Sequence, residues 1–139
     1  MRVAVVYEST RGRTKAMAEA ICEGVVSAGA ECVVYDARDF PGFNGLCGLA
    51  IGSSTRMKRT LPMVKRLLSE LPALDGLPAA AFGSYGWSGE APDEIAGMLS
   101  GAGASLIEEN PIKAKDYPSD SILAQCRDIG SKLAANCQK

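Results

Sequence analysis

The chain has 139 residues, 47% of them hydrophobic, and a formal net charge of −1 from 15 basic and 16 acidic side chains. This composition predicts one globular domain over residues 1–139, and the balanced charge excludes bulk attraction to nucleic acid or to an anionic membrane. The sequence has no histidine, which excludes Ser-His and Cys-His nucleophile pairs and His-rich metal sites.

The first half of the chain alternates between predicted strands and helices. A strand at 2–7 precedes an amphipathic helix at 14–28. A strand at 31–35 leads into residues 36–47, where Pro and Gly indicate a loop or a single helical turn. A third strand follows at 48–52. The unbroken apolar run at 3–6 is typical of strands that are covered on both faces, as in a parallel sheet.

The second half continues the same alternation. A helix is predicted at 60–71, a strand at 78–83, a helix at 91–100, a strand at 104–107 and a last helix from about residue 119. We find no repeats and no uninterrupted apolar stretch of membrane-spanning length. Strand-helix alternation predicts right-handed crossovers and a three-layer α/β domain.

The loop after the first predicted strand has the residues of an anion site. Ligands of such sheets bind beyond the carboxyl ends of the strands, so the loops after strands one, three and four are the candidates. Residues 8–14, ESTRGRT, offer hydroxyls, a glycine for a tight turn and the free N–H groups of a helix start. The segment lacks both the P-loop and the dinucleotide fingerprints. An ordinary capped helix is the alternative interpretation.

The other two loops add polar edges and aromatic rings. Residues 52–60, GSSTRMKRT, carry small polar side chains. Residues 82–91, FGSYGWSGEA, place Tyr85 and Trp87, the single tryptophan, on a glycine-rich turn, where they offer a platform for a flat ligand. The three loops together favour a flat, phosphorylated ring system, although each alone fits plain turn chemistry.

Three ordered motifs resemble those of flavodoxins. They are Y-x-S-T-x-G-x-T at 7–14, G-S-x-T at 52–55 and F-G-S-Y-G-W-S-G-E-A at 82–91, and they are most similar to the flavodoxin domain of A-type flavoproteins, the flavodiiron family. The resemblance spans essentially the whole chain. It implies a flavodoxin-like sandwich, with a five-stranded parallel sheet in the order 2-1-3-4-5, helices on both faces and FMN at the ends of strands one, three and four.

The resemblance also implies which residues bind FMN. The first loop would bind the ribityl phosphate, residues 55–57 would cover one face of the isoalloxazine, and residues 84–89 would cover the other, with Trp87 as the stacking partner. The whole candidate set is Ser9, Thr10, Arg11, Gly12, Arg13, Thr14, Ser53, Ser54, Thr55, Arg56, Met57, Ser84, Tyr85, Gly86, Trp87, Ser88 and Gly89.

The candidate loops are more basic than those of flavodoxins. Arg11 and Arg13 stand where small neutral residues are usual, and Arg56, where many flavodoxins stack an aromatic, is followed by Lys58 and Arg59. Cations near a flavin are expected to raise its reduction potential and to favour acidic partners.

Met57 is a further departure from the flavodoxin pattern. It replaces a glycine at a position where many flavodoxins flip the peptide toward the flavin. A side chain there makes positive φ costly, by roughly 1 kcal/mol.

The leading interpretation is a cytoplasmic FMN-binding electron carrier without catalytic residues or a metal site. Its partners would be redox proteins, either ferredoxin-like donors or flavoprotein or metalloprotein acceptors, with no role for nucleic acid or membrane. Two alternatives stay open: a flavodoxin-like NAD(P)H:quinone oxidoreductase, favoured by Thr55-Arg56, and a flavin-free binding or regulatory module of the same fold. The oligomeric state is left open.

The cysteines suggest no chemistry of their own. Their number, five, is odd, and none forms a C-x-x-C pair. We therefore expect small, buried apolar side chains at these positions, with a redox or metal role as the alternative.

Overall fold

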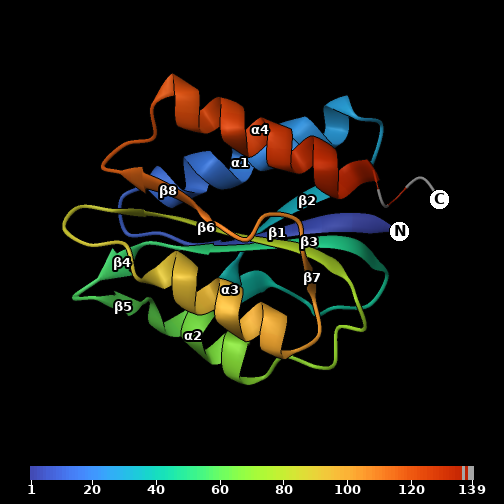
Figure 1. Ribbon diagram of the computed structural model, residues 1–139, viewed down its shortest axis with the longest axis horizontal. Coiled ribbons are helices and arrows are strands. Elements are labelled where there is room, and N and C mark those ends of the chain that lie inside the picture. The colour runs from blue at the N-terminus through green and yellow to red at the C-terminus, as the bar shows by residue number, and fades with distance from the viewer. Residues whose placement is uncertain (136, 138–139) are drawn as a thin grey trace.

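A computed structural model describes residues 1–135 and 137. A central sheet lies between two pairs of helices (Figure 1): α1 (Arg13–Ser27) and α4 (Asp120–Ala135) cover one face, and α2 (Pro62–Ser69) and α3 (Ala91–Gly101) cover the other. The predicted loop at 36–47 contains one 3-10 turn, η1 (Ala37–Asp39). The three-layer α/β prediction is confirmed. In the described part of the chain, no helix is both long and apolar enough to cross a bilayer.

The sheet has the predicted strand order. Its strands are β1 (Arg2–Glu8), β2 (Cys32–Asp36), β3 (Leu46–Ser53), β6 (Pro78–Tyr85), β7 (Ser105–Leu106) and β8 (Ile112–Lys115). They pair in the order β2-β1-β3-β6-β7, with β8 also on β6, and every pair is parallel. The predicted order 2-1-3-4-5 is therefore confirmed for five positions.

The fifth position is shared by two short strands, where the sequence predicts one. β7 pairs with the first residues of β6 and β8 with the last, Phe82 to Tyr85. Between them lies the segment 107–111, where Pro111 has no N–H to donate. β8 was missed because its sequence, IKAK, has only two apolar residues, both buried, and lies on the edge of the sheet.

The two faces of the sheet are both buried, as the run at 3–6 predicts. Val3 and Val5 belong to the core beneath α1 and α4, and Ala4 and Val6 to the core beneath α2 and α3. All four are fully buried. The alternation of a strand thus supplies side chains to two cores at once.

Close contact between α1 and α4 depends on two glycines. A Cβ at Gly24 would lie 1.9 Å from the carbonyl oxygen of Arg127, and one at Gly130 would lie 2.0 Å from that of Ile21. The helix backbones therefore touch at these positions, where no larger residue fits.

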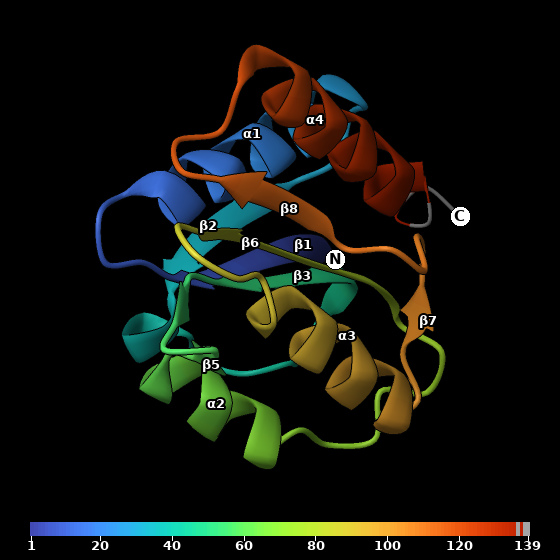
Figure 2. The ribbon, with the colours of Figure 1, turned by 60° about the vertical axis from the view of Figure 1, so that its left-hand side comes forward.

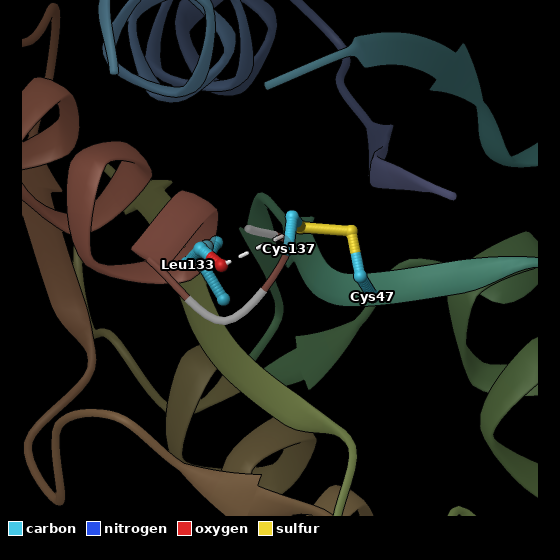
Figure 3. The surroundings of a disulfide bond; sticks show 3 residues. All are labelled: Cys47, Leu133 and Cys137. Carbon is cyan, nitrogen blue, oxygen red and sulfur yellow. Dashed lines mark hydrogen bonds between the residues drawn. A yellow bond between two sulfur atoms is a disulfide. The ribbon is translucent and has the colours of Figure 1, made fainter. Parts of the chain in front are cut away.

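The cysteine expectation is wrong for four of the five residues. Cys22 of α1 is bonded to Cys32 of β2, and Cys47 of β3 to Cys137, just beyond α4 (Figure 3). Cys126 stays a free, buried thiol, and burial raises its pKa to about 12. The pairs were missed because they form across elements that only the fold brings together.

Candidate functional site

The three candidate loops meet at one edge of the sheet, where β1, β3 and β6 end (left in Figure 1). The β3–α2 connection, predicted only as a loop, forms a hairpin of β4 (Thr55–Arg56) and β5 (Arg59–Thr60). In Figure 2 the hairpin lies above α2, on the same side of the sheet as α3. Parallel strands end together at one edge, so segments about 40 and 70 residues apart can form one site.

The β1–α1 loop has the geometry of an anion site. Gly12 adopts the left-handed φ of 79°, and its N–H donates to Ser9 Oγ at 2.9 Å. Among the residues that the structure describes, no side chain caps the start of α1, so the N–H groups of its first turn are available to a ligand. A cavity of about 90 Å³ lies here, lined by Thr10, Arg11, Arg13, Ser54, Thr55, Ser84, Tyr85 and Gly86.

Beneath this cavity, three hydroxyl groups join the three loops. Thr14 Oγ1 lies 2.9 Å from Ser54 Oγ and 2.8 Å from Ser84 Oγ, and the two serine oxygens are 3.4 Å apart. All three residues are buried. We call them the hydroxyl cluster. Thr14 thus supports the site from within, while Ser54 and Ser84 also line the cavity.

The charges at the cavity come mainly from two arginines. Arg13 Nη1 lies 3.6 Å from Oδ1 of Asp116, a residue just beyond β8, so the charge of Arg13 is partly offset. Arg11 has no carboxylate within ion-pair distance in the described residues. Asp116 escaped the sequence analysis because β8, which positions it, was not predicted. The remaining charge still favours an anion.

A more open cleft adjoins the cavity. It has a volume of about 310 Å³ and is lined by Thr55, Met57, Lys58, Trp87 and Ser88. Trp87 is 90% exposed and Met57 is 86% exposed. Large apolar side chains left this open beside a cleft are typical of a surface that a flat ligand covers.

The hairpin turn has an uncommon backbone. Met57 and Lys58 have φ of 51° and 64°, in the left-handed region that glycine or asparagine normally occupies in such turns. The base of the hairpin is fixed on both strands: Thr55 Oγ1 accepts from the N–H of Ala91 at 3.0 Å, and Ser53 Oγ accepts from the N–H of Leu61 at 3.0 Å. The sequence expectation of a costly positive φ at Met57 therefore applies to this structure.

Not all candidate residues lie at the cleft. Arg56 lines a separate cavity with Arg59, whereas Lys58, which the candidate set omits, lines the cleft. Ser53 is buried, and its hydroxyl donates to the carbonyl oxygen of Ser54 and accepts from the N–H of Leu61. Gly89 packs against Tyr85: a Cβ at Gly89 would lie 3.1 Å from Cδ1 of the Tyr85 ring. Only the place of Lys58 in the hairpin turn could have identified it, and the sequence did not predict that turn.

Comparisons with known proteins agree with this geometry. A family model described as flavodoxin matches residues 5–130. The anaerobic nitric oxide reductase flavorubredoxin of Aeromonas hydrophila is 35% identical over 96% of this chain, and the match covers 28% of that protein. The chain thus spans little more than a quarter of the length of the curated relatives it matches.

Solved structures also match over essentially the whole chain. A flavodoxin from the domain Archaea has a TM-score of 0.92 and 35% identity, with both chains fully covered. The flavodiiron protein of Giardia intestinalis has a TM-score of 0.87 and 26% identity over 99% of this chain and 36% of that one. Both matches agree with the resemblance found from the three motifs.

Proposed function

The chain belongs to the flavodoxin family, whose cofactor is FMN, and we propose that it passes electrons between redox proteins while FMN stays bound at the three loops. The observation that carries this proposal is the junction of a small polar cavity with an open cleft beside an exposed tryptophan. Bound FMN supplies the capacity to accept and donate electrons, and the chain holds it in place.

The cavity fits the phosphate of FMN. Hydroxyls from all three loops line it, the uncapped start of α1 adds N–H donors, and Arg11 and Arg13 add positive charge. Gly12, with positive φ, lets the chain turn there, and a Cβ at this position would meet nothing within 4 Å. The cost of a side chain at Gly12 is therefore conformational and not steric.

The cleft fits the ring system. Trp87 from the β6–α3 loop and Met57 from the hairpin present apolar surface on its walls, and Thr55 and Ser88 present hydroxyls. These groups would cover the ring faces and exclude water from them while one edge stays open to a partner. Burial of both exposed side chains by the ring would contribute about 1.5–3 kcal/mol each at most.

The charge at the cleft sets the expected redox behaviour. Lys58 lines the cleft, and one cation at this exposed position should favour the reduced, negatively charged cofactor by about 1 kcal/mol after screening. That corresponds to about 40 mV for one electron. We therefore expect Lys58→Gln to lower the reduction potential of the bound cofactor by some tens of millivolts. A redox titration that finds no change would contradict this.

Partners follow from the same surface. Positive side chains on the loops favour negatively charged redox proteins, either ferredoxin-like donors or flavoprotein or metalloprotein acceptors. The name flavorubredoxin joins a flavoprotein to a rubredoxin, and this supports a small redox protein as partner. The rate of electron transfer should then fall as ionic strength rises; a rate independent of salt would contradict the electrostatic part.

Titration of the apoprotein with FMN and with riboflavin tests the proposal. FMN should quench the fluorescence of Trp87, the single tryptophan, in a saturable way, and riboflavin, which lacks the phosphate, should bind more weakly. Gly12→Ala should reduce this difference, whereas Gly97→Ala, in open space on α3, should not. Absence of FMN uptake would overturn the function. Equal binding of riboflavin would overturn the phosphate assignment.

A further inference from the structure

Two arginines face each other across the hairpin. Arg56 of β4 and Arg59 of β5 are direct partners in the antiparallel register, so their side chains leave the hairpin on the same face. Both are exposed, and in the described residues neither has a carboxylate within ion-pair distance. Like charges placed directly opposite each other destabilise a strand pair. We call Arg56 and Arg59 the arginine pair.

The arginine pair borders a cavity of its own. The cavity has a volume of about 400 Å³, and its other lining residues are Met57, Thr60, Leu61 and Pro62. Met57 belongs both to this cavity and to the FMN cleft, so the two hollows share the hairpin tip as a common wall. A molecule that docks over the cleft therefore lies within reach of the arginine pair.

The hairpin holds the two arginines in register despite a second unfavourable feature. Its turn residues, Met57 and Lys58, both have positive φ, although neither is a glycine. Two hydrogen bonds hold its base: the N–H of Ala91 in α3 donates to Thr55 Oγ1, and the N–H of Leu61 donates to Ser53 Oγ, which joins the two ends of the hairpin. Charge repulsion and a strained turn thus occur together in four consecutive residues. Both are explained if the tip has a binding role.

We propose that the arginine pair receives an aspartate or glutamate carboxylate of the docked electron-transfer partner, as a recognition site distinct from the FMN cleft. Two guanidinium groups side by side offer forks of N–H donors that match the oxygens of one carboxylate. This inference rests on the proposed function. The contact would set which acidic partner docks, and in which orientation.

A protein carboxylate fits this site better than a free anion does. Both arginines are exposed, and a free anion beside exposed cations gains little because water and salt compete for them. A partner that covers the cleft removes that water from the shared hairpin wall and strengthens the same contact. The apolar residues Met57, Leu61 and Pro62 add surface that a protein can bury and a small ion cannot.

Stopped-flow reduction of the FMN-loaded protein tests this inference, with a reduced rubredoxin and a reduced ferredoxin, both of net negative charge, as probes. The variants are Arg56→Gln/Arg59→Gln, Arg56→Lys/Arg59→Lys and, as the control, Arg127→Gln. Arg127 is an exposed arginine of α4, on the opposite face of the sheet. FMN content is measured for every variant first, so that loss of cofactor is not mistaken for loss of docking.

We expect the glutamine pair to lower the second-order rate with at least one probe about tenfold at low salt, and Arg127→Gln to leave it near the wild-type value. With Arg56→Lys/Arg59→Lys, the rate should keep its salt dependence, because lysine keeps the positive charge. The complex with the probe should still dissociate faster than the wild-type complex does, because lysine lacks the forked donors of arginine. The inference is overturned, and the carrier function stands, if Arg56→Gln/Arg59→Gln has the same second-order rate as Arg127→Gln. The same holds if the complex of Arg56→Lys/Arg59→Lys dissociates no faster than the wild-type complex. A wild-type protein that takes up no FMN, or accepts electrons from neither probe, overturns the proposed function itself.

Discussion

Replacement of Thr14 by valine removes the central oxygen of the hydroxyl cluster and keeps nearly the same side-chain shape. Thr14 Oγ1 makes two buried hydrogen bonds, at 2.9 Å to Ser54 and 2.8 Å to Ser84. After the change, the contact of 3.4 Å between the two serine hydroxyls is the only side-chain hydrogen bond left to them within the described part of the chain. Each lost bond is worth about 1 kcal/mol, so we expect the free energy of unfolding to fall by about 2 kcal/mol.

Urea unfolding of the apoprotein measures this loss directly. For a chain of this length, the midpoint of thermal unfolding should fall by roughly 8 °C. Thr14→Ser keeps the hydroxyl and should stay closer to wild type. Thr10→Val alters an exposed threonine at the phosphate cavity, so it should weaken FMN binding without changing the unfolding free energy.

The FMN affinity of Thr14→Val separates two roles of the cluster. Because Ser54 and Ser84 also line the cavity, their displacement should weaken FMN binding at temperatures where the variant is fully folded. An unchanged unfolding free energy would refute the hydrogen-bond argument. A destabilised variant that binds FMN as wild type does would show that the cluster supports the fold and not the site.

Three further changes probe the fold. Gly130→Ala puts a methyl group against the α1 backbone and should lower the free energy of unfolding in urea by about 1–3 kcal/mol or more. Gly97→Ala, in open space on α3, should raise it by about 0.5–1 kcal/mol. Equal effects of the two variants would contradict the close contact between the helices. Cys47→Ser removes the disulfide that closes a loop of 90 residues and should lower the free energy of unfolding by about 4.6 kcal/mol. Cys22→Ser removes the one that closes a loop of 10 residues and should lower it by about 2.7 kcal/mol. The reverse order would count against loop entropy as the cause. The hydrogen bond from Arg38 lowers the pKa of Asp36 from its ordinary value of 3.8, so ionised Asp36 stabilises the native state above that pH. Asp36→Asn should therefore lower the free energy of unfolding at pH 7. The difference in this free energy between variant and wild type should shrink as the pH falls below 3.8.

Most of the fold was predictable because its signals are local. The run at 3–6 predicted a strand with two buried faces, and Val3 and Val5 lie in one core and Ala4 and Val6 in the other. Helical periodicity located all four helices to within about two residues at most ends, because it reflects neighbours on one turn. β8 was missed because two apolar residues are too few to give a pattern.

The residues that line the candidate site were also predictable as a set, but their arrangement was not. Loop composition and the three motifs picked out, as candidates, the residues that line the small cavity at the β1–α1 loop and Trp87 at the cleft. They did not reveal that residues 55–60 form a hairpin, which turns Arg56 away to pair with Arg59 and places Lys58 at the cleft. Which side of a hairpin a residue occupies depends on strand register, and one residue of shift reverses it.

The sequence by itself determined the layers, the strand order through a family resemblance, and the three loops that build the site. Only the tertiary structure decided which hydroxyls join these loops, which cysteines bond and where two helix backbones touch. Thr14 meets Ser84 across 70 residues, and Cys47 meets Cys137 across 90. Periodicity reports only the few residues nearest along the chain, whereas these contacts exist because the sheet brings distant segments to one place.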